Sequence, residues 1–588
     1  MTLQTLTAAE IKELEAKLDH AFESSRLPGT DYYRAAWAIL TAGENEARTM
    51  VDATKTRARS PRGTDPPAVI NQRVSFFFDN YKYALKQALK LCAAKLPVGA
   101  EAQSFEWDHA NNSLAKDLLF ERAKDYADIN RKFLALHNHL YKCAKEDDGY
   151  ITFPEPEDRL PYSALEILCW DKRERERARP AARAPIDFMI DILNHEKMWN
   201  TTVEEIVKRA KVIDKRLEYP FLRNLARRLQ GQFELDMVPV PADWLFPWGT
   251  VAETELAYRA LVARCCYHIA TVHFLDKQAK LARQGLNHVC LVTDRSVLIQ
   301  DLVRISGLTT EKVSTFLSAL TCGSGVDSPD PALQPLVPLG SATLAVPGFL
   351  MFSSNHARNF LSLHIRLDQK HFDENSHVFE QQMTKEICAA IGHRFSIVKE
   401  NFYAPDGGEG AQIDVVLGEH KSRTLIFLEL RWMLNPGDPR EVINRISECR
   451  RKVRQHAPKI TKARALLPKL LTKLGLNASE SWQVFGLVVI EGFGGTPTIP
   501  ESGVPIVPRE VFLSVLKHMK DVRHLYPFFM DRRWLPENGK DFVLRAEKQE
   551  VFGIPMKKES FGAGQRAYFT EAIPDALKAF EEAAASPS

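Results

Sequence analysis

Apolar residues recur at the three- and four-residue spacing of amphipathic helices through most of the first half of the chain. Seven stretches have this spacing: residues 8–23, 31–40, 44–53, 69–95, 111–144, 186–230 and 254–284. Two proline-rich stretches, residues 180–185 and 239–249, interrupt the pattern. The pattern predicts a mostly α-helical N-terminal region, divided into one domain over residues 1–180 and another over residues 186–285.

The middle of the chain has the pattern of a helix-turn-helix. Residues 296–305 and 310–320 read as two helices separated by Gly307, and residues 336–347 have the composition of a β-hairpin. A winged-helix-like unit over residues 287–364 would follow, with DNA as its ligand. The alternative is an ordinary helical hairpin that packs neighbouring domains together, and the few basic residues in the second helix favour this alternative.

The pattern changes to alternating helices and strands after residue 370. A helix over residues 379–391 precedes three apolar strands, and another helix and strand follow them. The expected strands lie at residues 395–398, 413–417, 425–428, 482–491 and 504–508, and the expected helices at residues 379–391, 440–456 and 509–520. We therefore predict an α/β domain over residues 370–520. Residues 521–588 are expected to form a C-terminal extension that ends in an amphipathic helix.

Two apolar strands of this domain each carry one carboxylate. Asp414 follows Ile413, and Glu429 follows a run of four apolar residues. Burying a carboxylate is costly unless it is paired or binds a cation, and hard oxygen ligands suit Mg²⁺ or Mn²⁺. The alternative is structural: Asp414 would be an acid at a strand end, and Glu429 and Arg431 an ordinary same-face pair two residues apart.

These residues carry a resemblance to a known family. A helix with Glu380, a strand with Asp414 and a following strand with Glu429-Leu430-Arg431 are together similar to the PD-(D/E)xK, or restriction-endonuclease-like, nuclease superfamily. The similarity extends over residues 379–519. It implies that Asp414, Glu429 and the backbone carbonyl of Leu430 hold a metal ion, and that Glu380 is a second ligand or orients a water.

The chain departs from the family motif at Arg431, which stands where the family has lysine. A guanidinium can stabilise phosphate charge, but it stays protonated and is a poor proton acceptor. Three alternatives remain open. The metal alone suffices, Lys399 or Lys421 substitutes in space, or catalysis is weak or lost.

A basic tract follows the carboxylates in sequence. The expected helix over residues 440–456 is rich in cations and also carries a glutamine: Arg445, Arg450, Arg451, Lys452, Arg454 and Gln455. Lysine and arginine contacts to phosphates supply most non-specific nucleic-acid affinity. These residues are therefore candidates for nucleic-acid binding, and a solvated helix face is the alternative.

Composition restricts the remaining choices. The chain has 588 residues, a formal net charge of +3 and nine cysteines without metal-ligand spacing. No apolar run is long enough for a membrane span, and the odd, scattered cysteines predict a reducing cytoplasm.

The resemblance implies metal-dependent cleavage of DNA, with RNA as an open alternative, in bacterial defence against foreign DNA. The helical region would be its sensor or regulator, and a second copy of the chain or a defence protein its partner. Two further alternatives are a catalytically silent nucleic-acid-binding protein and a protein-interaction scaffold.

Overall fold

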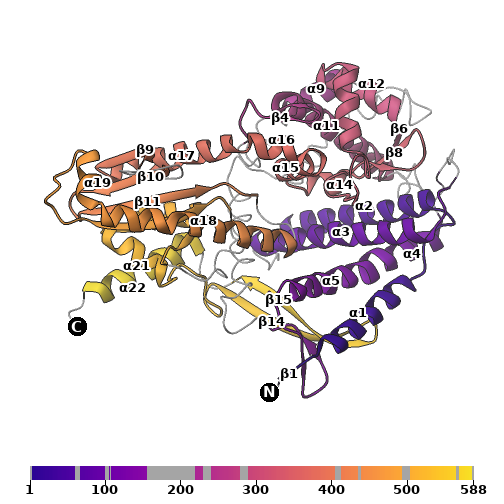
Figure 1. Cartoon of the computed structure of the whole chain (residues 1–588). Coiled ribbons are helices and arrows are strands. Elements are labelled where there is room, and N and C mark those ends of the chain that lie inside the picture. The colour runs from indigo at the N-terminus through magenta and orange to yellow at the C-terminus, as the bar shows by residue number, and fades with distance from the viewer. Residues whose placement is uncertain are drawn as a thin grey trace. The chain divides into compact units, whose positions relative to one another are not determined.

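The computed structural model describes residues 3–59, 67–99, 105, 108–154, 219–228, 240–277, 289–403, 412–434, 439–492, 503–563 and 568–585. These residues form two compact units, each built from separate stretches of the chain (Figure 1). Unit 1 contains Met1–Lys12, Arg131–Arg173 and Glu374–Ser588, and unit 2 contains Glu13–Asn130 and Glu174–Asp373. The expected domain boundary at residues 180–185 lies outside the described residues.

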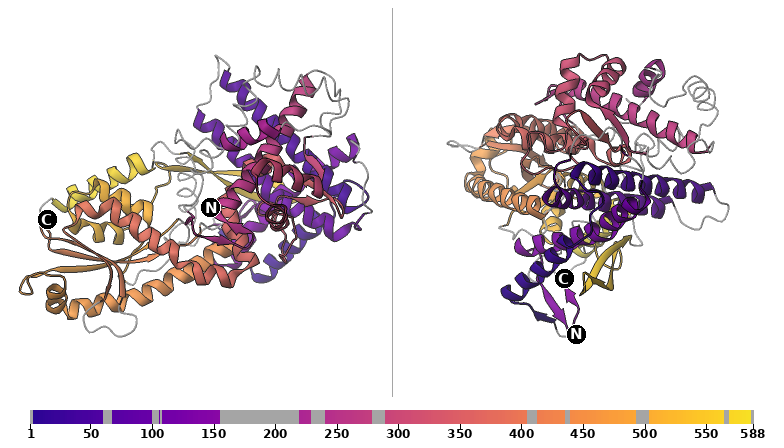
Figure 2. Two further views of the ribbon diagram at one scale, coloured as in Figure 1. Left: turned by 90° about the horizontal axis from the view of Figure 1, so that it is seen from above. Right: turned by 90° about the vertical axis from the view of Figure 1, so that its right-hand side faces the viewer.

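Helices dominate the N-terminal part, as the hydrophobic pattern predicts. They are α1 (Ala8–Glu23), α2 (Tyr32–Arg59), α3 (Pro67–Lys95), α4 (His109–Lys116), the π-helix η1 (Asp117–Ala123) and α5 (Lys124–His137). Helices α2 and α3 run side by side in both Figure 1 and Figure 2.

One long helix replaces two expected ones. The sequence suggests a break near Gly43, because glycine disfavours helix interiors, but α2 continues through it. A Cβ on Gly43 would lie 2.3 Å from Cε2 of Tyr81 on α3. Gly43 therefore permits close packing of two helices and does not end one.

The remaining part of unit 2 combines helices with small sheets. The helices are α9 (Tyr219–Arg228), α11 (Val251–Lys277), α12 (Arg295–Ser306), α13 (Thr310–Ala319), α14 (Gly348–Phe352), α15 (His356–Leu367) and α16 (Gln369–Asn375). The strands are β4 (Leu245–Phe246), β5 (Gly249–Thr250), β6 (Leu291–Asp294), β7 (Val337–Pro338) and β8 (Thr343–Val346). The last three form an antiparallel sheet in the order β6-β8-β7. The expected helix-turn-helix is present as α12 and α13, with Gly307 in the left-handed conformation between them.

A buried carboxylate ties α2 to α14. Glu44 accepts hydrogen bonds from the backbone N–H groups of Phe349 (2.8 Å) and Leu350 (3.1 Å). These donors belong to the first turn of α14, where backbone N–H groups have no partner within the helix. Burial raises the pKa of Glu44 to about 8, although the hydrogen bonds oppose the rise.

Unit 1 is organised around a five-stranded mixed sheet with the order β13-β12-β11-β10-β9. The strands are β9 (Ile397–Tyr403), β10 (Gln412–Glu419), β11 (Thr424–Arg431), β12 (Gln483–Ile490) and β13 (Ile506–Pro508). Strand β10 is antiparallel to both neighbours, whereas β11, β12 and β13 are parallel. The expected strands are thus found, with boundaries shifted by a few residues.

Helices cover both faces of this sheet. One face packs on α17 (His377–Ile391), α20 (Arg509–His518), α21 (Leu525–Met530) and α22 (Ile573–Ala585). The other packs on α18 (Pro439–Ala465) and α19 (Leu467–Lys473). Figure 2 shows α18 and the yellow C-terminal helices on opposite sides of the sheet. Helices α21 and α22 therefore complete the core of the α/β unit: Phe528, Phe529, Trp534 and Ile573 are buried in it.

A second sheet joins the start of the chain to its end. Its order is β1-β2-β3-β15-β14, with β1 (Leu3–Thr5), β2 (Ala144–Glu146), β3 (Ile151–Thr152), β14 (Phe542–Val551) and β15 (Ile554–Ala563). Strands β14 and β15 form a long antiparallel hairpin, and Met556 of β15 pairs with Ile151 of β3. The sequence analysis did not predict this hairpin.

The search for membrane spans gives a negative result. Among the described residues, every helix is too short or too polar to cross a bilayer.

Candidate active site

The two strand carboxylates lie on adjacent strands of the sheet. The register of β10 and β11 pairs Val415 with Leu428, so the next position along brings Asp414 opposite Glu429. Asp414 Oδ2 accepts a hydrogen bond of 2.7 Å from the backbone N–H of Leu430. Successive side chains of a strand point to opposite faces of the sheet, and helices cover both faces. Both strands are therefore buried over nearly their whole length. The two carboxylates that the sequence singles out are therefore brought together.

Asp414 lies in an unfavourable environment for a negative charge. Burial raises its pKa, and the negative charge of Glu429 raises it further. The hydrogen bond from Leu430 and the charge of Lys452 act in the opposite direction. Its second oxygen, Oδ1, has no hydrogen bond to any described residue. A cation at Asp414 would therefore relieve a repulsion already present in the fold.

Glu429 is surrounded by positive groups from α18. Lys452 Nζ donates a hydrogen bond of 3.2 Å to Oε1, and Lys459 Nζ donates one of 2.8 Å to Oε2. Lys459 also donates to the backbone carbonyl of Gln412 at 2.6 Å. Burial alone would raise the pKa of Glu429, but hydrogen bonds from His456 and Lys459 and the charge of Lys452 outweigh it and lower the pKa to about 2. Glu429 is thus ionised although only 4% of it is exposed.

His456 connects the same carboxylate to the strand below it. Its Nε2 lies 3.0 Å from the carbonyl oxygen of Phe427, which can only accept, so Nε2 carries a hydrogen. Its Nδ1 lies 3.5 Å from Glu429 Oε2.

The sequence analysis missed the roles of Lys459 and His456. A signal was present, because Lys452, His456 and Lys459 have the i, i+4, i+7 spacing that places residues on one helix face. The cationic composition of the helix drew attention to its phosphate-binding capacity and away from this single face.

Arg431 is held away from Asp414 and Glu429 by two other acids. Its Nη1 donates a hydrogen bond of 2.7 Å to Glu380 Oε1, and its Nε lies 2.9 Å from Glu448 Oε1. Glu448 also accepts from Arg451 Nε at 2.9 Å. The hydrogen bond from Arg451 lowers the pKa of Glu448, and the charge of Arg431 adds to this effect. Glu380 is therefore engaged by Arg431, although its charge still acts on Asp414.

Helix α18 divides the predicted nucleic-acid-binding residues into three groups, of which Lys452, at Glu429, is one. Arg450, Arg451, Arg454 and Gln455 are exposed to solvent. Arg445 is only 4% exposed, and its guanidinium donates to the backbone carbonyls of Leu434 (2.6 Å) and Glu491. Arg445 therefore satisfies loop carbonyls at the strand ends, and we leave it out of the nucleic-acid surface.

The lysines proposed to substitute for the family lysine lie elsewhere. Lys399 is an exposed residue of edge strand β9, in register with Val416. Lys421 lies in the turn that joins β10 to β11, beyond the Glu419–Thr424 pair. The ammonium groups at the carboxylates come from α18 instead.

Two of the predicted site residues fit a divalent cation. Asp414 and Glu429 offer hard oxygen ligands from neighbouring strands, whereas no group of three or more His, Cys, Asp or Glu residues with metal-binding geometry occurs within the described ranges. Leu430 contributes to the site through its backbone N–H, which donates to Asp414.

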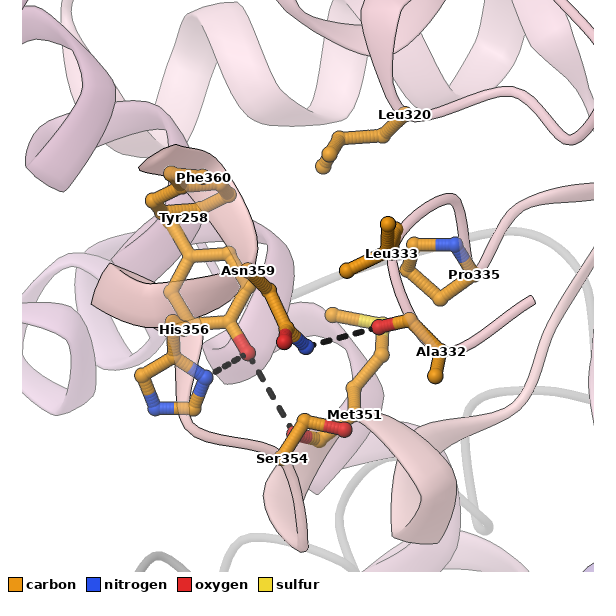
Figure 3. Close-up of a pocket in the computed structure, with 10 residues that line it drawn as sticks. All are labelled: Tyr258, Leu320, Ala332, Leu333, Pro335, Met351, Ser354, His356, Asn359 and Phe360. Carbon is orange, nitrogen blue, oxygen red and sulfur yellow. Dashed lines mark hydrogen bonds between the residues drawn. The ribbon is translucent and has the colours of Figure 1, made fainter. Parts of the chain in front are cut away.

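A pocket in unit 2 is the other candidate site. It has an empty volume of about 280 Å³, open mouth included, and is lined mainly by apolar groups (Figure 3). The Tyr258 hydroxyl lies 2.6 Å from His356 Nδ1, and Asn359 Nδ2 donates to the carbonyl of Ala332 at 2.7 Å. Burial lowers the pKa of His356 to about 3, so its imidazole is neutral. The polar groups in Figure 3 are largely bonded to one another, which is typical of structural packing.

Comparisons with protein-family models, with curated proteins and with solved structures find no match to this chain.

Proposed function

We propose that this protein is a metal-dependent nuclease that hydrolyses DNA phosphodiester bonds. The observation that carries the proposal is the meeting of Asp414 and Glu429 on adjacent strands, with ammonium groups from α18 beside them. The order α17-β9-β10-β11-α18-β12 supports it as well, because the resemblance to PD-(D/E)xK nucleases involves this succession of elements.

Asp414 and Glu429 would hold the cation, Mg²⁺ or Mn²⁺. The cation would supply Lewis acidity and neutralise charge that develops on the phosphate. The fold contributes orientation, since the Leu430 N–H fixes Asp414 and the α18 side chains fix Glu429. Glu380 would lie at the edge of the site, held by Arg431.

The nucleic-acid strand would follow the exposed side of α18. Arg450 and Arg454 are one helical turn apart on that side, and Arg451 and Gln455 flank them. Gln455 lies between Lys452 and Lys459 in helical spacing, so it borders the site. Neutralising phosphates with these arginines would give salt-dependent affinity.

The succession α11, β6, α12, α13, β7, β8 with sheet order β6-β8-β7 supports a winged-helix interpretation of the middle of unit 2. The N-terminal end of its second helix is not free for DNA, because Lys312 pairs with Glu253. We therefore propose a regulatory role for this part, in sensing or in recruitment of a partner.

A silent nuclease fold that only binds nucleic acid is the second candidate. The observation in its favour is that each oxygen of Glu429 already has an ammonium partner and that Arg431 is engaged by Glu380 and Glu448. A cation would have to compete with lysine for Glu429.

A cleavage assay separates the two candidates. Purified full-length protein is incubated with plasmid and linear DNA in Mg²⁺, Mn²⁺ or EDTA, beside Asp414→Asn and Glu419→Gln. Glu419 is the matched control, because it lies on the same strand beyond the site. We expect metal-dependent cleavage, a loss of about 100-fold or more in Asp414→Asn, and an unchanged rate in Glu419→Gln.

Absence of cleavage in every metal, with salt-sensitive DNA binding retained, would favour the silent candidate. Arg450→Gln/Arg454→Gln then tests the surface. The slope of log affinity against log salt should fall by roughly one for each phosphate that the variant no longer neutralises. Cleavage unaffected by Asp414→Asn would contradict the proposed site.

A further inference from the structure

Lys452 and Lys459 reach the same carboxylate from one helix face, but their surroundings differ. Lys459 donates to Glu429 at 2.8 Å and to the Gln412 carbonyl at 2.6 Å, so it joins α18 to both carboxylate-bearing strands. This geometry is that of a positioning residue, which fixes Glu429 and the start of β10.

Lys452 makes fewer hydrogen bonds than Lys459 does. Its one hydrogen bond within the described residues is to Glu429 Oε1 at 3.2 Å, and an ammonium has three donors. Its charge also lowers the pKa of Asp414, so its field covers both carboxylates. The side chain is 13% exposed, as against 14% for Lys459, so the hydrogen bonds and not the exposure distinguish the two lysines.

Arg431 does not have this freedom. Glu380 and Glu448 hold its guanidinium on two sides, at 2.7 and 2.9 Å. These ion pairs occupy Nη1 and Nε and fix the direction in which the guanidinium points. Arg431 therefore acts on Glu380 and on α18 as a positioning residue.

We propose that Lys452 is the catalytic ammonium of the nuclease site. It would donate hydrogen bonds to a non-bridging oxygen of the scissile phosphate. This inference rests on the proposed function and names a residue for it that the sequence motif does not contain.

The role of Lys452 is electrostatic. A water oxygen attacks phosphorus, the bond from phosphorus to a sugar oxygen breaks, and its electron pair stays on the sugar oxygen. The water gives one proton to solvent, and the sugar oxygen takes one from solvent. Lys452 exchanges no proton in this step and stabilises the negative charge that grows on the phosphate oxygen.

The test compares four full-length variants by steady-state cleavage: Lys452→Gln, Lys452→Arg, Asp414→Asn and the control Lys385→Gln. The amide of Lys452→Gln can still donate to Glu429, which favours folding, and thermal unfolding checks this. Lys385 is an exposed lysine of α17. We expect kcat to fall by about 100-fold or more in Lys452→Gln, with KM little changed. Lys452→Arg, which keeps the charge, should recover at least about tenfold of the loss, and Lys385→Gln should match the wild type.

Two failures can be told apart. If Asp414→Asn abolishes cleavage while Lys452→Gln stays within about threefold of wild type, the role of Lys452 is refuted and the nuclease function stands. If the wild type cuts no DNA in any metal, both are refuted. If Lys452→Gln does not fold, Lys452→Arg becomes the test variant. Folded Lys452→Arg must then differ from the wild type in kcat, and a change in KM alone would refute the role of Lys452.

Discussion

Glu44 and Glu429 are both buried, yet their pKa values lie on opposite sides of the ordinary glutamate value. Glu429 has cations around it, and its pKa is about 2. The donors to Glu44 are neutral, backbone N–H groups of α14 among them, and burial raises its pKa to about 8. The sequence marked Asp414 and Glu429 because a carboxylate interrupts an apolar strand. The sequence did not indicate Glu44, because a glutamate within a helical pattern is usually exposed and only the structure shows that this one is buried.

Glu44 should make the stability of unit 2 depend on pH. Its pKa in the folded protein, about 8, exceeds the ordinary value of 4.5. The folded form therefore keeps its proton between these values while the unfolded form loses it, so the contribution of Glu44 to stability is fully present below pH 4.5 and is lost as pH rises to about 8. We expect a loss on the order of 3–5 kcal/mol across this window.

Thermal unfolding between pH 5.5 and 8 measures the effect. Glu44→Gln should flatten the decline, and Glu121→Gln, at an exposed residue of η1, should leave it unchanged. Equal slopes in wild type and Glu44→Gln would show that Glu44 does not cause the decline.

At the scale of elements, the strands that the sequence predicted are those with apolar cores. Strands β10, β11 and β12 are buried for nearly their whole length. Strand β14 has only two buried residues, one at each end, and half of its ten residues are exposed, so it lacks the alternation that reveals a strand. Strands β2 and β3 have three and two residues and depend on partners far along the chain. Local patterns cannot reveal elements that only distant pairing stabilises.

Packing of α18 on β12 should be sensitive to one added methyl group. A Cβ on Gly486 would lie 1.8 Å from Cδ1 of Ile460, and His456 Nε2 would be 3.1 Å away. Gly486→Ala should therefore lower the free energy of unfolding by about 1–3 kcal/mol. It should also reduce DNA cleavage, because α18 carries Lys452 and Lys459.

Urea unfolding and the cleavage assay together check this expectation. Ile460→Val removes the Cδ1 atom, so the double variant Gly486→Ala/Ile460→Val should recover part of both losses. Additive effects of the two substitutions would mean that the predicted contact does not form.

At the scale of the molecule, neither compact unit is one continuous segment. The sequence analysis divided the chain at composition changes, and these separated residues 521–588 from the α/β domain. The structure places helices α21 and α22 of this range in its core, and it pairs β14 and β15 with residues 3–5, 144–146 and 151–152 in the second sheet. Leu140 also packs in the core under α18. Long-range pairing of this kind leaves no trace in local composition.

A fragment of residues 374–588 should therefore be incomplete. It retains the candidate site but lacks β1, β2, β3 and Leu140, so β15 acquires an unpaired edge and the core under α18 is short of one buried leucine. We expect faster amide hydrogen exchange in β15 than in the full-length protein. Size-exclusion chromatography should also show aggregation.

Addition of the segment of residues 131–154 as a separate peptide is the matched test, because it carries β2, β3 and Leu140. Protection of β15 should then rise. Full protection in the fragment alone would show that the hairpin is stable without its partners.

The pairing of β3 with β15 also has a consequence for synthesis. A ribosome makes β1, β2 and β3 hundreds of residues before the hairpin that completes their sheet, and the polypeptide passes between the two units at residues 12–13, 130–131, 173–174 and 373–374. The early strands therefore remain without their partner until β14 and β15 have been made. Assembly of unit 1 is thus a late event in translation, and a truncated product would contain Asp414 and Glu429 without the finished scaffold around them.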